Sequence, residues 1–382
     1  MREQGQAAGA RRDATNAARR ASAGVRERMR ATAFWLRVPL RAELEITRRC
    51  NLRCRHCYLP RAADGRPEAS SASLARLISD LREAGCMSVI LTGGEVLLRD
   101  DFFGLAAAVK AHGMALSVIT NGTLWAEAEV AELARIKPAS VTVSLYAADA
   151  AVHDAVTGVP GSFERTCAGV RRLVDAGLRC HVTSVLMPDT IEGFGALRRL
   201  GAELGCGVSF DPTVSPRCDG DLDVLRYRVP GRRLLDFYRD EFTFEHSREG
   251  SAVKGTRPFD GVKRNCGAGF TAVFVDAAGE VYPCMGFPPA FGNIDQGFTA
   301  VWHGEVAETH RRRMSEPLQE CSGCGLAYLC TTRCPRLALI EDGSVSAASS
   351  RACEMAQMVA ELRRSRAGGG MPAPVHESYM LR

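Results

Sequence analysis

Three cysteines fall within eight residues near the start of the chain, in the run Cys50-Asn51-Leu52-Arg53-Cys54-Arg55-His56-Cys57-Tyr58. The spacing C-x3-C-x2-C can hold three corners of a [4Fe-4S] cube, and it leaves the fourth iron without a protein ligand. An iron with an open position can bind and reduce another molecule, so the motif predicts chemistry as well as folding. A structural zinc site is the alternative. Zinc needs four tetrahedral ligands, and the only nearby fourth candidate, His56, sits between two of the cysteines.

Regular alternation of apolar, β-rich runs with helical patterns begins at residue 42. Several helical runs start at Ser or Asp and end at glycine, as capped helices do. This alternation indicates parallel βαβ units, and six of them predict an α/β fold, an open, partial (β/α)6 TIM-type barrel. The expected strands are 42–47, 87–92, 115–120, 140–146, 181–187 and 207–212. The expected helices are 71–84, 100–111, 125–136, 162–176 and 191–204.

Polar residues follow the expected strands at the end where such barrels carry out chemistry. Cys50 comes three residues after the first strand, and Gly93-Gly94-Glu95 follows the second. Two glycines let the backbone approach a ligand closely, and a carboxylate can accept from an ammonium group. Asn121 follows the third strand, and Ser144 lies in the fourth. No G-x-G-x-x-G opens a helix, which disfavours a dinucleotide site.

This series of motifs resembles the radical S-adenosylmethionine (SAM) enzymes. The resemblance implies that the open iron chelates the amino and carboxylate groups of SAM, which is cleaved to a 5'-deoxyadenosyl radical. It also implies that Gly93, Gly94 and Glu95 hold the SAM amino group, although Val96 replaces the usual proline. Asn121 and Ser144 are then candidates for the ribose or carboxylate, and Tyr58 for the adenine. The arginine that often follows the fourth strand is missing from 153–158.

A second set of cysteines has the spacing C-x12-G-x4-C followed by C-x2-C-x5-C-x3-C and a last cysteine after eighteen residues. It resembles the SPASM domain, a small cysteine-rich extension that binds two auxiliary [4Fe-4S] clusters, so that three clusters are expected in all. By that resemblance one cluster takes Cys266, Cys284 and Cys334. The other takes Cys321, Cys324, Cys330 and Cys353. Residues 268–283 contain no cysteine, which leaves the first cluster without a fourth cysteine. A pair of structural zinc sites is the alternative.

Composition supports this organisation. The net charge is +5, and residues 1–31 alone contain eight arginines and three acids, so no basic face for nucleic acid is expected on the rest. No apolar run is long enough to span a membrane, and we expect a cytoplasmic protein. The arginine-rich start is open to interpretation as a frayed helix, a docking arm or a transit segment. The expected division is a tail (1–39), the barrel (40–235), a bridge (236–265), the SPASM domain (266–355) and a C-terminal tail (356–382).

Five cysteines lie outside both sets, and four of them (Cys86, Cys167, Cys180 and Cys206) fall in apolar or helix-turn contexts that favour burial. Cys218 differs because it lies in a polar turn, where it is either an ordinary loop thiol or faces the active site.

The expected activity is hydrogen abstraction by the deoxyadenosyl radical. Chains of this type resemble maturases that crosslink or otherwise oxidise ribosomally made precursor peptides, forming thioether, C–C or C–O bonds. A small-molecule enzyme, for haem or tetrapyrrole modification or alcohol dehydrogenation, is the second hypothesis, and a non-catalytic metal-binding or redox-relay protein is the third. A flavodoxin- or ferredoxin-like reductant is expected. A separate leader-binding protein is a further possible partner, because no peptide-recognition domain fits into the forty residues before the barrel.

Overall fold

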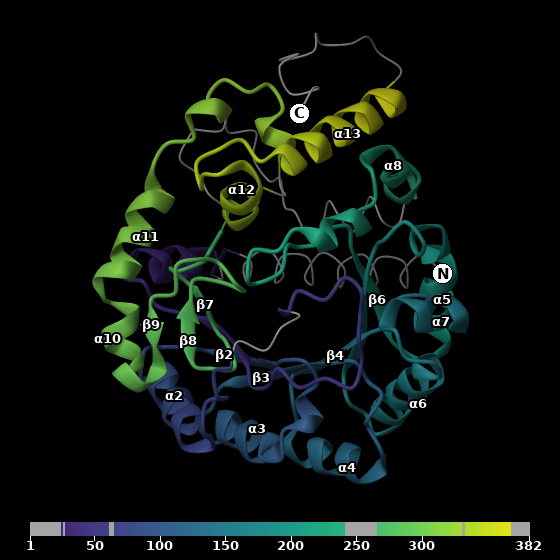
Figure 1. Ribbon diagram of the computed structural model, residues 1–382, viewed down its shortest axis with the longest axis vertical. Helices are drawn as coiled ribbons and strands as arrows, with labels where there is room; N and C mark the ends of the chain where they lie inside the picture. Colours follow the sequence, from purple (N-terminus) through teal and green to yellow (C-terminus); the bar gives the residue numbers. More distant parts are fainter. Residues whose placement is uncertain (1–23, 26, 61–64, 241–265, 331–332, 368–382) are drawn as a thin grey trace, which may run out of the picture.

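Six parallel strands in sequence order form the curved sheet that carries the site (Figure 1). The computed structural model describes residues 24–25, 27–60, 65–240, 266–330 and 333–367. Each strand pairs in parallel with the next, as right-handed βαβ units do. Their bounds are β1 (Arg41–Glu45), β2 (Ser88–Thr92), β3 (Ala115–Thr120), β4 (Ser140–Ser144), β5 (Cys180–Val185) and β6 (Gly207–Asp211).

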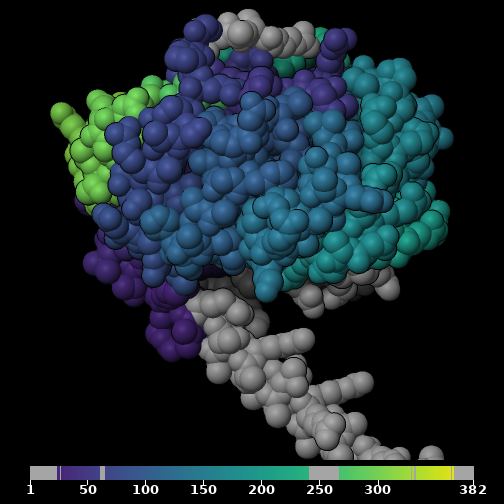
Figure 2. All heavy atoms as spheres, turned by 90° about the horizontal axis from the view of Figure 1, so that it is seen from below, coloured from purple at the N-terminus to yellow at the C-terminus, as the bar shows by residue number. Residues whose placement is uncertain are grey.

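Helices cover the outer face of this sheet (Figures 1 and 2). On each strand from β1 to β5, alternate apolar residues are buried against the helices, as Val141 and Val143 of β4 are, both 0% exposed. The polar residues between them stay half-buried on the inner face. The covering helices are α2 (Ser71–Glu83), α3 (Phe102–Ala111), α4 (Glu127–Ile136), α5 (Ala150–Thr157), α6 (Ser162–Asp175) and α7 (Phe194–Glu203).

The sheet continues beyond the six barrel strands into the cysteine-rich region. A hairpin of β7 (Ala272–Val275) and β8 (Glu280–Tyr282) pairs with β1 through β7, and β9 (Gly292–Asn293) adds to it. Its parallel pairing with β1, with Arg41 opposite Ala272, was not expected. The cysteine-rich region therefore continues one nine-stranded sheet, ordered β6-β5-β4-β3-β2-β1-β7-β8-β9.

The C-terminal helices pack above the open side of the barrel (Figure 1). Leu234 and Phe237 of one helix share a buried cluster with Met355 and Leu362 of another. The expected end of the barrel at residue 235 and the expected end of the SPASM domain at residue 355 both fall inside helices. The division into domains therefore stays a prediction. Residues 241–265, most of the expected bridge, lie outside the described residues. The helices are α8 (Gly231–Arg239), α10 (Phe298–Trp302), α11 (Glu305–Ser315), α12 (Pro335–Asp342) and α13 (Ser350–Ala367).

Part of the expected N-terminal tail is an ordered helix, because residues 27–36 are helical. Phe34 stacks on Phe270 with ring centroids 4.2 Å apart, and the indole of Trp302 donates to the carbonyl of Arg37 at 2.7 Å. The end of that segment therefore packs on the cysteine-rich region. Residues 1–23, on which the docking-arm and transit-segment interpretations depend, lie outside the described residues. None of the described helices is long and apolar enough to cross a membrane.

The α/β barrel with a C-terminal cysteine-rich region is confirmed, and all six expected strands are present. Three differences are instructive. Helix α5 was not expected, and the helix expected from 191 opens with a 3-10 turn at Ile191–Gly193 before α7. The strand expected at 140–146 ends at Ser144, which leaves Tyr146 in the loop that leads to α5.

Candidate active site and cluster-binding cysteines

The loop that carries Cys50, Cys54 and Cys57 is held against the end of β2 by backbone contacts. The amide of Gly94 donates to the carbonyl of Thr47 and the amide of Glu95 to that of Arg49, both at 2.8 Å. A Cβ on Gly94 would lie 2.3 Å from the Arg49 carbonyl oxygen, and one on Gly93 2.3 Å from that of Thr47. The two glycines are therefore required by the close approach of the cysteine loop itself. Their contact with SAM stays a prediction.

Helix α5 fixes the middle of the same loop. The amide of Arg53 donates to the carbonyl of Thr157 at 2.8 Å, and that of Arg55 to Val156 at 3.1 Å. Because the last carbonyls of a helix lack partners within the helix, this end of α5 satisfies its own acceptors by binding the loop. An element that the sequence did not reveal thus positions the cysteines.

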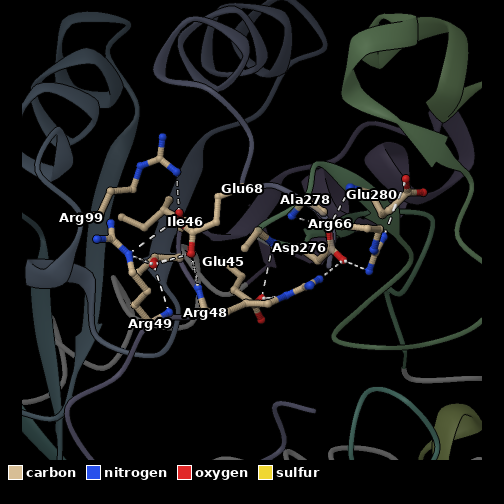
Figure 3. A network of polar contacts seen from close by, with 12 residues as sticks. Glu45, Ile46, Arg48, Arg49, Arg66, Glu68, Arg99, Asp276, Ala278 and Glu280 are labelled. Carbon is tan, nitrogen blue, oxygen red and sulfur yellow. Dashed lines mark hydrogen bonds and ion pairs between the residues drawn. The ribbon is translucent and has the colours of Figure 1, made fainter. Parts of the chain in front are cut away.

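A polar network ties the start of the cysteine loop to the turn of the β7–β8 hairpin (Figure 3). Arg48 donates to Asp276 at 2.8 Å, and Asp276 also accepts from Arg66 at 3.2 Å. Glu45, 2% exposed, accepts from Arg48 at 3.4 Å. Burial raises the pKa of Glu45 to about 7, and Arg48 opposes this rise only in part. Glu68 accepts from the amide of Arg48 at 2.8 Å. These side chains couple the barrel site to the cysteine-rich region.

Glu95 turns towards the end of β3 and is 1% exposed. Its carboxylate accepts from the hydroxyl of Thr120 and from the amide of Asn121, both at 2.7 Å. The amide side chain of Asn121 donates to Asn51 at 2.8 Å. Glu95 and Asn121 therefore join β2, β3 and the cysteine loop, which is a positioning role. Whether either also contacts SAM, as the resemblance implied, stays a prediction.

The three cysteines of the loop lie at the carboxyl end of the strands. Cys50 is exposed, and Cys54 and Cys57 are half-buried. Burial raises the pKa of Cys54 to about 12, so this thiol needs a cation to become a thiolate, and bound iron supplies one. Burial lowers the pKa of His56 to about 4, and its buried Nδ1 has no hydrogen-bond partner among the residues that the structure describes. A neutral imidazole with an unsatisfied nitrogen fits a site that another group completes.

Ser144 and Tyr146 lie next to Cys54. Tyr146 is 8% exposed and packs with Cys54 in one buried cluster. Its ring meets that of His56 edge-on, with centroids 4.7 Å apart, and stacks on His153 at 5.6 Å. The contact of Ser144 with SAM stays a prediction. Sequence reasoning missed Tyr146, although the period of two that selected Ser144 places Tyr146 on the same side of the chain.

The seven remaining motif cysteines lie in the cysteine-rich region, and their division between two clusters, which the SPASM resemblance implied, stays a prediction. The Cys284 thiol has Cys266 and Cys334 as its charged neighbours, and burial raises its pKa. Cys330 and Cys353 neighbour each other and also Cys321 and Cys324, and burial raises the pKa of Cys330 to about 11. Grouped thiolates of this kind suit iron-sulfur or zinc binding. That each group holds a cluster, and what completes the first, stays a prediction.

The turn that contains Cys218 links the two regions. Buried Arg217 donates to the carbonyls of Cys57 at 2.6 Å and Leu59 at 3.0 Å, and the amide of Cys218 donates to that of Tyr58 at 2.9 Å. From the other side, buried Arg336 donates to the carbonyls of Pro216, Arg217 and Gly286. Tyr58, the expected adenine contact, is half-buried at this junction. Cys218 is thus held between the two cysteine-bearing regions, and whether it is an ordinary loop thiol or faces the active site stays a prediction.

Comparison with known proteins identifies the family. A family model described as the radical SAM superfamily matches residues 44–201, and one described as SPASM, an iron-sulfur cluster-binding domain, matches residues 266–325. Mycofactocin maturase MftC from Mycolicibacterium smegmatis is 30% identical over 323 residues, 78% of this chain and 79% of that protein. This chain belongs to the radical SAM superfamily. The AdoMet-dependent heme synthase of Methanosarcina barkeri is 27% identical over 304 residues, 74% of this chain and 86% of that protein.

The fold is shared with solved radical SAM structures. Streptococcus suis SuiB bound to its precursor peptide SuiA superposes with a TM-score of 0.66 at 20% sequence identity, covering 82% of this chain and 76% of that one. The likeness at this identity shows the fold alone. The last three cysteines of the C-terminal set lie beyond the residues that the SPASM model matches.

This radical SAM enzyme uses a [4Fe-4S] cluster and SAM, and its SPASM domain binds iron-sulfur clusters. The residues present fit these groups: Cys50, Cys54 and Cys57 supply three thiolates, and the unsatisfied Nδ1 of His56 marks room for a further partner. When bound, the cluster and SAM supply a primary carbon radical that removes hydrogen from an unactivated carbon. The protein's own part is to hold the cysteine loop through Gly94, α5 and Arg217, and to shield the site from water.

Proposed function

We propose that this radical SAM enzyme oxidatively modifies a ribosomally made precursor peptide, which lies as an extended chain along the free edge of β6. Radical abstraction of a hydrogen followed by loss of one electron to an auxiliary cluster would form a thioether, C–C or C–O crosslink. A flavodoxin- or ferredoxin-like protein would supply the electron that starts each turnover, and a separate leader-binding protein would present the peptide.

The proposal rests on the unpaired outer edge of β6. β6 is its last strand, pairs only with β5 among the described residues, and has no buried residue. An exposed strand edge is a template for an extended peptide, whose backbone amides and carbonyls complete the ladder. A tetrapyrrole has no such backbone.

The register of β6 identifies the atoms that would bind the peptide. The carbonyl of Asp211 accepts from the amide of Leu186 at 2.8 Å, so Asp211 directs its backbone groups towards β5. Alternate residues point their amides to opposite edges. Val208 and Phe210 therefore direct their backbone groups to the free edge.

The relatives support the proposal in part. MftC is named a maturase, and SuiB was solved with a precursor peptide. The heme synthase, at similar identity, supports the second candidate, a small tetrapyrrole substrate.

The test uses anaerobically reconstituted protein with SAM and a chemical reductant. Peptides encoded by short reading frames beside the gene, and a coproporphyrin-type tetrapyrrole, are offered separately. Mass spectrometry of the peptide should show the loss of two hydrogen atoms together with formation of 5'-deoxyadenosine. Turnover of the tetrapyrrole alone would refute the peptide proposal. Cys50→Ser, which removes one corner of the cube, is the inactive control.

The edge itself is tested with Val208→Pro, which removes one outward amide without taking a hydrogen bond from β5. Val208→Ala is the matched control, because it loses the same side-chain packing and keeps the amide. We expect Val208→Pro to weaken peptide binding while both variants keep their iron. Equal peptide affinity of the two variants would show that the peptide does not add to β6.

A further inference from the structure

Cys218 lies against the turn that carries Cys284, one of the three predicted ligands of the first auxiliary cluster. A Cβ added to Gly286 would lie 2.6 Å from the Sγ of Cys218 and 2.9 Å from its Cβ. The amide of Phe287 donates to the carbonyl of Cys284 at 3.1 Å, so Cys284 and Gly286 belong to one tight turn. Glycine at position 286 therefore leaves the space that the half-buried Cys218 side chain fills.

Arg336 holds this arrangement together from α12. Its guanidinium is 3% exposed and donates to the carbonyl of Gly286 at 3.1 Å. It also donates at 3.3 Å to the carbonyl of Arg217, the residue directly before Cys218. Cys334, another predicted ligand, is the N-cap residue of α12 and lies two residues before Arg336. One buried side chain therefore joins the segments that carry Cys218, Cys334 and the turn at Gly286.

The third predicted ligand, Cys266, lies beside the same turn. Cys266 and Cys284 pack against one buried apolar cluster, and Leu339 of α12 packs against it as well. The amide of Gly269 donates to the carbonyl of Pro283 at 3.2 Å, which ties the segment after Cys266 to the residue before Cys284. The three predicted ligands and Cys218 thus come from segments that contact one another.

A cube needs four ligands, and the predicted division gives the first auxiliary cluster only three cysteines. Thiolates suit such a cluster, so a cysteine outside the two motifs is the natural fourth ligand. Cys86, Cys180 and Cys206 lie at the starts of β2, β5 and β6, at the opposite end of the barrel from the cysteine loop. Cys167 lies in the middle of α6. Of the five cysteines outside the motifs, this leaves Cys218.

We propose that Cys218 is the fourth ligand of the first auxiliary cluster, which would then be held by one thiolate from the turn after the barrel and three from the SPASM domain. A cube with four cysteine ligands has no open iron. Its role is therefore to accept an electron, and the substrate does not bind to it. The amide of Cys218 also donates to the carbonyl of Tyr58 at 2.9 Å, so the same turn contacts the cysteine loop of the barrel. The proposal rests on the SPASM assignment and the predicted ligand set, and not on the identity of the substrate.

The test uses the full chain with the SAM-cleaving cluster removed by Cys50→Ala, Cys54→Ala and Cys57→Ala together, so that an open iron can belong only to an auxiliary cluster. After anaerobic reconstitution, iron is counted, and the protein is mildly oxidised with ferricyanide and measured by EPR. A cube with an open iron loses that iron on oxidation and gives a [3Fe-4S] signal.

We expect about eight irons per chain and no [3Fe-4S] signal in this starting protein. Adding Cys218→Ala should produce the signal in an amount that approaches the chain concentration. Cys206→Ala is the matched control, because Cys206 is also half-buried but lies at the start of β6, and it should produce none.

Two results would overturn the proposal. A [3Fe-4S] signal of equal size with and without Cys218 would show that the first auxiliary cluster is open in the native protein. No signal in either protein would show that another group completes the cluster. If Cys218→Ala loses the cluster altogether, Cys218→Ser decides, because a serine oxygen can bind iron in place of sulfur. That variant should keep about eight irons and change the EPR spectrum of the reduced cluster. An unchanged spectrum, or the same loss of iron, would refute ligation by Cys218.

Discussion

The buried carboxyl of Glu45 makes a quantitative prediction about stability and pH. Its pKa is raised from 4.5 to about 7, chiefly by burial, with Arg48 opposing and Asp276 adding to the rise. At about 1.4 kcal/mol per pKa unit, this rise corresponds to about 3 kcal/mol. Because the folded state holds the proton more tightly than the unfolded state, this stability is fully present below pH 4.5. It is lost as the pH rises through 7.

Glu45→Gln keeps a neutral acceptor for Arg48 and for the amide of Ala277 at every pH. We expect the free energy of unfolding of the variant to equal that of the parent near pH 5 and to exceed it by about 3 kcal/mol above pH 7.5. The assay is anaerobic urea unfolding of the loaded protein, followed by tryptophan fluorescence at half-unit steps from pH 5 to 8.5. At each pH, the free energy of unfolding of the parent is subtracted from that of the variant, and this difference is compared across the pH range.

The control for this experiment is Glu83→Gln, an exposed glutamate in the last turn of α2, whose difference from the parent should not change with pH. A Glu45→Gln difference that is the same at pH 5 and pH 8 would refute the reasoning. It would mean that Arg48 compensates the buried charge completely, and that the network in Figure 3 contains an ion pair without a desolvation cost.

Three further outcomes are expected. Gly94→Ala should lower the free energy of unfolding by about 1–3 kcal/mol and lose the iron of the SAM-cleaving cluster, because the added Cβ would collide with backbone atoms. Gly104→Ala on α3 is the control: its Cβ meets open space, and the variant should be more stable than the parent in a melting experiment. Arg336→Met should lower the free energy of unfolding in urea by about 3 kcal/mol, because buried carbonyls lose their hydrogen-bond donor. An unchanged urea midpoint would show that the turn around Cys218 does not depend on Arg336. Treatment with diamide should join Cys180 to Cys206, which directly precede or begin the paired strands β5 and β6 next to the partners His181 and Gly207, and peptide mapping that finds them separate would contradict the geometry.

Much of the barrel could be predicted because short, largely apolar runs alternate with helical patterns whose ends carry capping residues. Helix α5 was missed because it is short, with Val, His and Thr among its eight residues, and its role depends on a loop distant in sequence. The pairing of β1 with β7 leaves no local signal, since a register between residues 41 and 272 is set only by tertiary packing.

The cysteines were predictable for a different reason, because metal ligation imposes spacing on the sequence itself. Their supports were not predictable in this way. Arg217 and Arg336 act by donating to backbone carbonyls of segments distant in sequence, and such contacts require only the right place in space. Glu95 illustrates the limit: its motif was recognisable, but its bonds to Thr120 and Asn121 were not.

The pairing of β1 with β7 has a consequence for synthesis on the ribosome. Until the chain has been made past residue 282, the first strand of the barrel keeps one unpaired edge in the nascent protein. Such an edge is prone to aggregation, and closing a loop of this length is slow. The free edge of β1 is covered only after β7 and β8 have emerged, so the cysteine loop that follows β1 is expected to settle, and to load iron at Cys50, only after residue 282 has been made.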